Sequence, residues 1–124
     1  MADYASFSGE GAQLTFRKTP ETVKTRSVVK IFHIGADCSE DLRGKLIAET
    51  KPQTTVLEPR RTVIMVSIII SRPGSASERV RFFEITPRAG DALELVSFYD
   101  PSDYGVHLKT PQGMQEGAAH SNCR

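Results

Sequence analysis

The chain has no tryptophan, only two cysteines among 124 residues, and no long hydrophobic run. Two cysteines as far apart as Cys38 and Cys123 do not form the dense disulfide framework of a small secreted domain, which favours a reducing compartment. The strongest apolar run, Val63–Ile70, is far shorter than the roughly 20 residues that span a bilayer. The N-terminus lacks the basic and apolar regions of a secretory signal. These absences predict a soluble, cytoplasmic protein.

The sequence also lacks the specific motifs of enzymes and cofactor-binding proteins. It contains no nucleophile elbow, no P-loop, no glycine-rich dinucleotide fingerprint and no paired-histidine zinc motif. We therefore expect a protein that is not an enzyme and has no cofactor. One weaker catalytic candidate places a general base at His107, held by Asp100 or Asp103, with Tyr104 between them. The Asp-Pro-Ser-Asp segment is also ordinary turn chemistry.

The histidines and cysteines form only a loose metal-ligand pattern. His33 with Cys38, and His120 with Cys123, could supply four nitrogen and sulfur ligands. Zinc sites usually have tighter spacing, and the second pair lies among the last residues of the chain. We expect no metal, with His33 as a packed histidine and Cys38 as an interior side chain.

Alternation of apolar and polar residues predicts strands along most of the chain. A helix is predicted only over Asp37–Glu49, where Asp37 can cap it, Glu40 follows three residues later and Leu42 and Leu46 share a face, although Gly44 weakens it. The predicted strands are 13–18, 27–34, 53–57, 62–71, 78–86, 92–99 and 104–109.

The predicted fold is therefore mainly β, a β-sandwich or barrel-like arrangement of about seven strands with one short helix, and α+β is the alternative. Hydrophobic residues make up 39% of the chain and charged residues 25%, which are fractions typical of a globular domain. We expect one domain over residues 13–109, a flexible N-terminus over 1–12 and a flexible C-terminal tail over 110–124.

The formal net charge of +1 conceals an uneven distribution. Residues 14–88 hold fourteen basic and eight acidic side chains, a net charge of +6. Residues 89–123 hold one basic and five acidic side chains, a net charge of −4. A basic body with acidic ends can attract an anionic partner that the total charge would not suggest.

Arginine carries most of the positive charge in the middle of the chain. Arg79, Arg81 and Phe83 share one face of a predicted strand, where guanidinium groups beside an aromatic ring could bind phosphates and stack bases. The alternative is that they are surface arginines that keep a sheet soluble. Further candidate anion-binding residues flank the first, second and fourth predicted strands, namely Arg17, Lys18, Lys24, Arg26, Arg60 and Arg61.

The run Val63–Ile70 is apolar on both faces of its strand. Its simplest position is the centre of a sheet, and the alternative is an interface strand that presents Val66, Ile68 and Ile70 to a partner. We expect a non-enzymatic interaction or assembly module that forms homo-oligomers and offers a basic sheet face to an anionic surface such as RNA. A small viral structural or accessory protein would fit this description. A single-stranded nucleic-acid-binding domain is the alternative, and a small enzyme centred on His107 is the third hypothesis.

Overall fold

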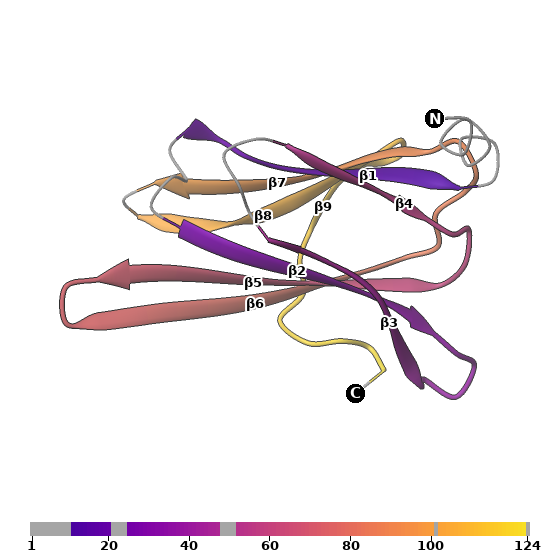
Figure 1. The fold of residues 1–124 in the computed structure, drawn as a ribbon, viewed down its shortest axis with the longest axis horizontal. Coiled ribbons are helices and arrows are strands. Elements are labelled where there is room, and N and C mark those ends of the chain that lie inside the picture. Colours follow the sequence, from indigo (N-terminus) through magenta and orange to yellow (C-terminus); the bar gives the residue numbers. More distant parts are fainter. Residues whose placement is uncertain (1–10, 21–24, 48–51, 101, 124) are drawn as a thin grey trace.

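The computed structural model shows nine strands in two sheets that pack face to face as a β-sandwich (Figure 1). It describes residues 11–20, 25–47, 52–100 and 102–123, and none of these forms an α-helix. The strands are β1 (Ala12–Lys18), β2 (Thr25–Ile34), β3 (Glu40–Ile47), β4 (Gln53–Leu57), β5 (Thr62–Arg72), β6 (Ser75–Ile85), β7 (Ala92–Asp100), β8 (Asp103–Thr110) and β9 (Gly113–Glu116).

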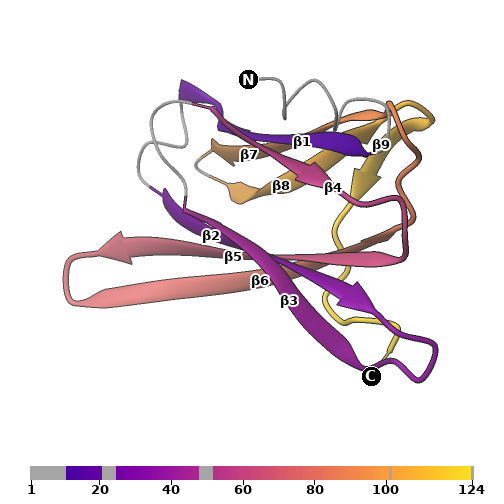
Figure 2. The same cartoon turned by 45° about the vertical axis from the view of Figure 1, so that its right-hand side comes forward.

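The two sheets differ in size and in strand pairing. The five-stranded sheet has the order β4-β1-β7-β8-β9, and the four-stranded sheet has the order β3-β2-β5-β6. The pair β1–β7 is parallel, whereas the other strand pairs are antiparallel. Figure 2 shows the two layers and the β5–β6 hairpin, which extends beyond the neighbouring strands.

The core lies between the facing sides of the two sheets. Its side chains alternate along each strand, because successive side chains of a strand point to opposite faces. None of the core residues is more than 5% exposed. They are Ala12, Leu14, Phe16, Val29, Ile31, Leu57, Ile64, Val66, Ile68, Phe83, Leu93, Leu95, Val106 and Leu108.

The predicted mainly β fold is confirmed, and of the two predicted architectures the structure has the β-sandwich. All seven predicted strands are present, with boundaries that differ by at most three residues from those expected. The apolar run lies in β5, a central strand between β2 and β6, as its β-branched side chains favour. The two additional strands, β3 and β9, lie at sheet edges.

The predicted helix over Asp37–Glu49 is wrong for residues 37–47, which form a hairpin turn and strand β3, and its last two residues lie outside the described part of the chain. The amide of Cys38 donates to the carbonyl of Gly35, and the amide of Gly35 donates to the carbonyl of Ser39, which closes a three-residue hairpin loop. Cys38 has a φ of 64°, the left-handed conformation that this loop requires at its last position and that usually selects glycine. The carboxylate Oδ1 of Asp37 accepts a hydrogen bond from the amide of Ser39 within the turn, and does not cap a helix. Pairing with β2 therefore overrides the local helix signals.

The C-terminal segment was expected to be a flexible tail from residue 110, and the structure gives it specific partners. Residues 113–116 form β9 against β8. Ala118 then exchanges two backbone hydrogen bonds with Phe82 of β6, at 2.8 and 2.9 Å. These long-range contacts hold a segment that has no periodic apolar pattern of its own. No helix in the described part of the chain is long and apolar enough to cross a membrane.

Candidate functional site

The three residues predicted for an interface lie in the core. Val66 and Ile68 have no exposed surface and Ile70 is 3% exposed, because all three point from β5 toward the five-stranded sheet. This placement is a correction to the expected interface residues. The other face of β5, which carries Met65, Ser67 and Ile69, is only half-buried and points away from the core.

An apolar surface covers the side of the four-stranded sheet that faces away from the core. In the strand register, Ser67 lies between Val28 and Val80, and Lys30 lies beside Met65. We call this surface the apolar outer face, and its half-buried members are Val28, Phe32, Met65, Ile69, Val80 and Phe82. Leu42 of β3 pairs with Phe32 in the register and is 54% exposed. These six apolar side chains lie around Lys30 and Ser67 on the outside of the sheet and form a candidate docking surface.

The outside of the five-stranded sheet is more polar, although Val56, Val96 and Met114 also lie on it. Thr15 and Thr54 share a hydrogen bond of 3.0 Å between their hydroxyl groups. Glu94 pairs with Arg17 at 2.5 Å and with Lys109 at 3.7 Å. Ion pairs and hydroxyl groups give this sheet a solvated outer side, which the apolar outer face of the other sheet lacks over most of its area.

Opposite charges lie on the two sides of the apolar outer face. The register places Arg26 of β2 and Glu78 of β6 on either side of Ile69. Both charged residues are exposed, and the hydroxyl of Ser67 donates a hydrogen bond to the carboxylate of Glu78. A surface with a positive and a negative group on opposite sides of an apolar centre can complement a second copy of itself.

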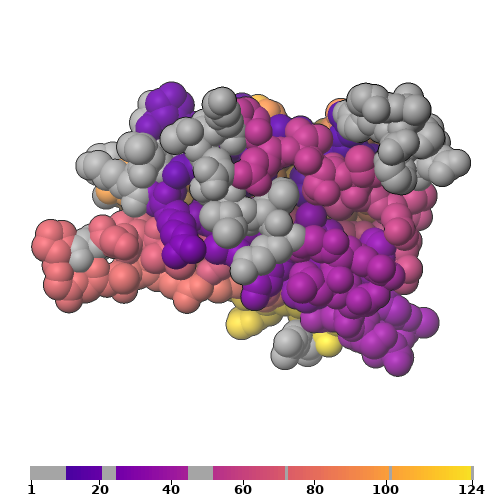
Figure 3. Space-filling model, viewed as in Figure 1, coloured from indigo at the N-terminus to yellow at the C-terminus, as the bar shows by residue number. Residues whose placement is uncertain are grey.

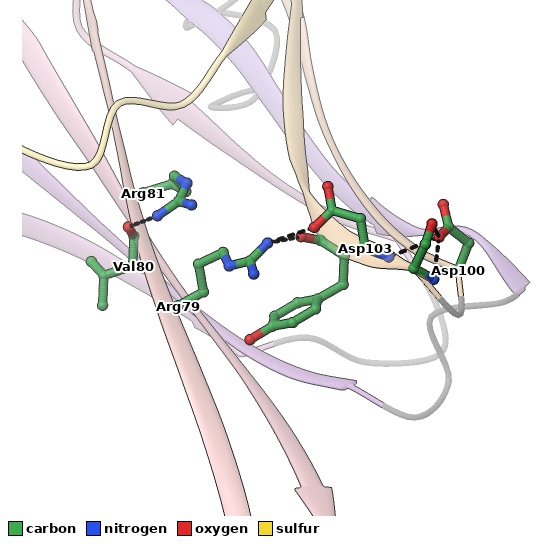
Figure 4. A network of polar contacts seen from close by, with 7 residues as sticks. Arg79, Val80, Arg81, Asp100 and Asp103 are labelled. Carbon is green, nitrogen blue, oxygen red and sulfur yellow. Dashed lines mark hydrogen bonds and ion pairs between the residues drawn. The ribbon is translucent and has the colours of Figure 1, made fainter.

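Arg79 and Arg81 lie on the core-facing side of β6, where Arg79 reaches the start of β8 in the other sheet (Figure 4). Nη1 of Arg79 donates to Oδ1 of Asp103 at 2.8 Å and to the carbonyl of Tyr104 at 2.7 Å. Nη1 of Arg81 donates to the carbonyl of Val80 at 2.8 Å. Phe83 is 1% exposed and belongs to the core, so it presents no ring to a base. This part of the predicted basic face joins the two sheets.

The other predicted basic residues do not converge with Arg79 and Arg81. Arg17 pairs with Glu94, and Nζ of Lys18 donates to the carbonyl of Thr25 at 2.7 Å. Arg61 pairs with Glu84 at 3.6 Å on the other sheet. Arg26 and Arg60 are exposed, and Lys24 lies outside the described residues. The cations are therefore distributed over both sheets, most of them beside a carboxylate or a carbonyl.

His107 lies on the outside of β8 and its ring stacks on Phe98, with centroids 4.6 Å apart. A cavity of about 190 Å³ beside it is also lined by Arg81, Asp103 and Glu116. The predicted carboxylate partners of His107 are engaged elsewhere. Asp100 accepts hydrogen bonds from Ser102 and from the amide of Asp103, which lower its pKa. The hydrogen bond from Arg79 lowers the pKa of Asp103.

His33 is buried at 3% exposure near four charged groups. Its Nδ1 accepts a hydrogen bond of 3.1 Å from Nε of Arg43, and Glu58 is 3.9 Å away. Burial lowers the pKa of His33 below 6.5, and the charges of Arg60 and Arg43 add to this effect while Glu58 and Asp41 oppose it. His33 is a packed histidine with a neutral acceptor nitrogen.

The two cysteines form a bond that sequence spacing gave no reason to expect. Cys38 in the β2–β3 turn is joined to Cys123 by a disulfide with a Cα–Cα distance of 5.5 Å. Among the described residues no cluster of histidine, cysteine and carboxylate side chains has the arrangement of a metal site. The two cysteine sulfur atoms of the candidate metal-ligand pattern are therefore bonded to each other.

The fold defines a two-sheet β-sandwich protein whose distinguishing surface is the apolar outer face. No model of a known protein family matches the chain, and no curated protein matches it.

Proposed function

We propose that this protein is a non-enzymatic assembly module that associates with a second copy of itself through the apolar outer face of the four-stranded sheet. The observation that carries the proposal is the contrast between the two outer sheet surfaces. One carries ion pairs and hydroxyl groups with scattered apolar side chains, whereas the other presents six half-buried apolar side chains from three adjacent strands around Lys30 and Ser67. Removing apolar surface from water contributes about 25 cal/mol per Å², so this surface gains from being covered.

The charges beside this face favour a second copy as its partner. In a face-to-face pair related by a two-fold axis along β5, Arg26 of each copy meets Glu78 of the other. The same pairing forms twice, since a two-fold interface is made of one surface and its own copy. Aligned packing of two sheets is a common arrangement, with a layer of apolar side chains between them.

The structure offers less support for the nucleic-acid alternative. Phe83 is in the core and Arg79 is held by Asp103 and Tyr104, so the expected stacking platform is not exposed. The disulfide also favours an oxidising compartment over the reducing cytoplasm predicted from the cysteine count, because cytosolic thiols are kept reduced.

Light scattering after size exclusion, over a range of protein concentrations, tests the proposal. We expect the mass of the wild-type protein to rise toward that of a dimer, and Val80→Lys to remain monomeric because lysine would be buried in an apolar interface. Thr54→Lys, on the polar side of the other sheet, is the matched control and should associate like the wild type. A wild-type protein that stays monomeric at every concentration would contradict the proposal.

A further inference from the structure

The last residues of the chain form a strap across the outer side of the four-stranded sheet. We define the strap as residues 118–123. It begins at β6, where Ala118 pairs with Phe82, and ends at Cys123, which is bonded to Cys38 in the β2–β3 turn. Figure 1 shows this segment running below β5 and β6, on the side away from β7–β9. Its atoms form the lower edge of the molecule in Figure 3, next to β3.

Polar contacts fix the strap between its two ends. The carboxylate of Glu84 points outward from β6. It accepts a hydrogen bond of 2.6 Å from the amide of Asn122 and one of 3.3 Å from the hydroxyl of Ser121. Ser121 is itself 5% exposed. Nη2 of Arg61 donates to Sγ of Cys123 at 3.3 Å and also lies 3.6 Å from Glu84.

The strap covers one end of the apolar outer face. Val63 lies between Glu84 and Phe32 in the register and points to the outer side of the sheet. It is only 2% exposed, whereas Met65 and Ile69, on the same side of β5, are half-buried. The difference follows the strap, whose residues Ser121 and Asn122 are bonded to the neighbouring Glu84. Displacing the strap would therefore add Val63, which lies beside Phe32, to the apolar outer face.

We propose that the Cys38–Cys123 disulfide is a thiol–disulfide exchange site, and that its reduction releases the strap and strengthens self-association. The claim about association rests on the proposed function, whereas the release of the strap does not. Both cysteines are half-buried, so a small dithiol reductant can reach the sulfur atoms. The single covalent tie at the end of the strap is the bond that such a reductant breaks.

The chemistry of the exchange has a preferred direction. A thiolate of the dithiol attacks Sγ of Cys38, the disulfide breaks, and Cys123 leaves as a thiolate beside the guanidinium of Arg61. The second thiol of the reductant then attacks the mixed disulfide and releases Cys38. Cys38 and Cys123 each end with a proton, and the reductant, which gives up two electrons, ends as a disulfide. Arg61 favours this route because its positive charge stabilises the leaving thiolate.

The conformation of Cys38 supplies a variant that removes the disulfide while keeping the turn. With a φ of 64°, position 38 suits glycine better than any other residue. Cys38→Gly therefore mimics the reduced protein with little risk to the β2–β3 hairpin. Cys123→Ser is the second mimic, altered at the other end of the strap.

The first experiment measures amide hydrogen exchange at Phe82 and Ala118 in the full-length protein, with and without dithiothreitol, beside light scattering. We expect reduction to raise exchange at both amides at least tenfold and to tighten dimerisation. Cys38→Gly should behave like the reduced protein and not respond to the reductant. Unchanged exchange on reduction would overturn the inference and leave the proposed function standing. If exchange becomes faster but no dimer forms in either redox state, the proposed function is overturned, and the redox control of assembly with it. If exchange becomes faster but the dimer affinity does not change, only the redox control of assembly is overturned.

The second experiment measures the rate of reduction of the disulfide by dithiothreitol. Arg61→Gln should slow the reaction several-fold, and Arg61→Lys should keep most of the wild-type rate because it keeps the charge. Arg60→Gln, which alters the exposed neighbouring arginine, is the matched control and should leave the rate unchanged. Equal rates for Arg61→Gln and Arg60→Gln would contradict the role given to Arg61.

Discussion

The guanidinium of Arg79 lies over the ring of Tyr104, 4.2 Å from the ring centroid, and joins the two sheets. The same guanidinium donates to the carbonyl of Tyr104, near the start of β8. An arginine that the sequence pattern assigns to an anionic ligand thus contacts the protein itself. Its contribution should be measurable as stability.

Replacing Arg79 by methionine should lower the free energy of unfolding by about 1–2.5 kcal/mol, because a cation–π contact contributes about 0.5–1 kcal/mol and a hydrogen bond to a backbone carbonyl about 0.5–1.5 kcal/mol. Urea denaturation measures this difference. Arg88→Met, at an exposed arginine before β7, is the matched control and should change the stability little. Equal stabilities of the two variants would show that the contact with Tyr104 does not hold the sheets together.

Stability should fall as the pH decreases below neutrality because of His33. Its pKa is lowered in the folded state, first by burial, so the unfolded state binds more protons once the pH drops below about 6.5. The contribution of this histidine is complete above pH 6.5 and is lost as the pH falls toward the folded pKa. Urea denaturation at several pH values should show a shallower decline for His33→Gln than for the wild type. His120→Gln, at an exposed histidine, should keep the wild-type profile, and matching profiles for both variants would refute this assignment.

Two glycines in strands should respond oppositely to substitution by alanine. A Cβ at Gly105 would lie 3.0 and 3.1 Å from ring carbons of Phe98, which stacks on His107, whereas a Cβ at Gly44 would lie 3.7 Å from Ile31. We expect Gly105→Ala to destabilise the protein by about 1–3 kcal/mol through overpacking. Gly44→Ala should be neutral or stabilise it by up to about 1 kcal/mol. Thermal unfolding of both variants tests the pair, and a stable Gly105→Ala protein would be inconsistent with the tight contact.

Substitutions in the core should lower stability without changing dimerisation, unlike substitutions in the apolar outer face. Ile68→Ala removes a fully buried side chain and should cost about 2–5 kcal/mol of stability. It should leave the dimer dissociation constant unchanged under conditions where the variant is folded, since Ile68 faces the other sheet. Denaturation and light scattering of the same samples give both quantities. A large loss of association with little loss of stability would place Ile68 in the interface after all.

Much of the sandwich could be predicted from the sequence because the strands carry their own signals. Residues 53–57 contain two threonines and a valine and lie between Pro52 and Pro59, and Pro73 and Gly74 mark the reversal between β5 and β6. The face of β5 that points inward could not be predicted, since Met65 and Val66 are equally apolar. The choice follows from the placement of the other sheet, which packs on Val66.

The errors share a physical cause in contacts between distant residues. The segment around Leu42 has helix-like spacing, but pairing with β2 makes it a strand. The strap has no periodic pattern, and its position depends on Glu84 and on a disulfide to Cys38 that spans 85 positions. The anion-binding hypothesis failed to foresee that carboxylates distant in sequence, such as Asp103, would lie beside the arginines.

The most direct test of face-to-face assembly is complementation between two charge-swapped variants. Arg26→Glu alone would place two negative groups together in the dimer, and Glu78→Arg alone would place two positive groups together. Each should dimerise about tenfold or more weakly than the wild type, a difference of about 1.4 kcal/mol. In a mixture of the two variants, a heterodimer restores both opposite-charge contacts.

Sedimentation velocity on each variant and on their equimolar mixture gives the decisive measurement. We predict mostly monomer for each variant alone and dimer at near wild-type affinity for the mixture. A mixture that is as monomeric as its components, while the wild-type protein dimerises, would contradict assembly through the apolar outer face in this orientation.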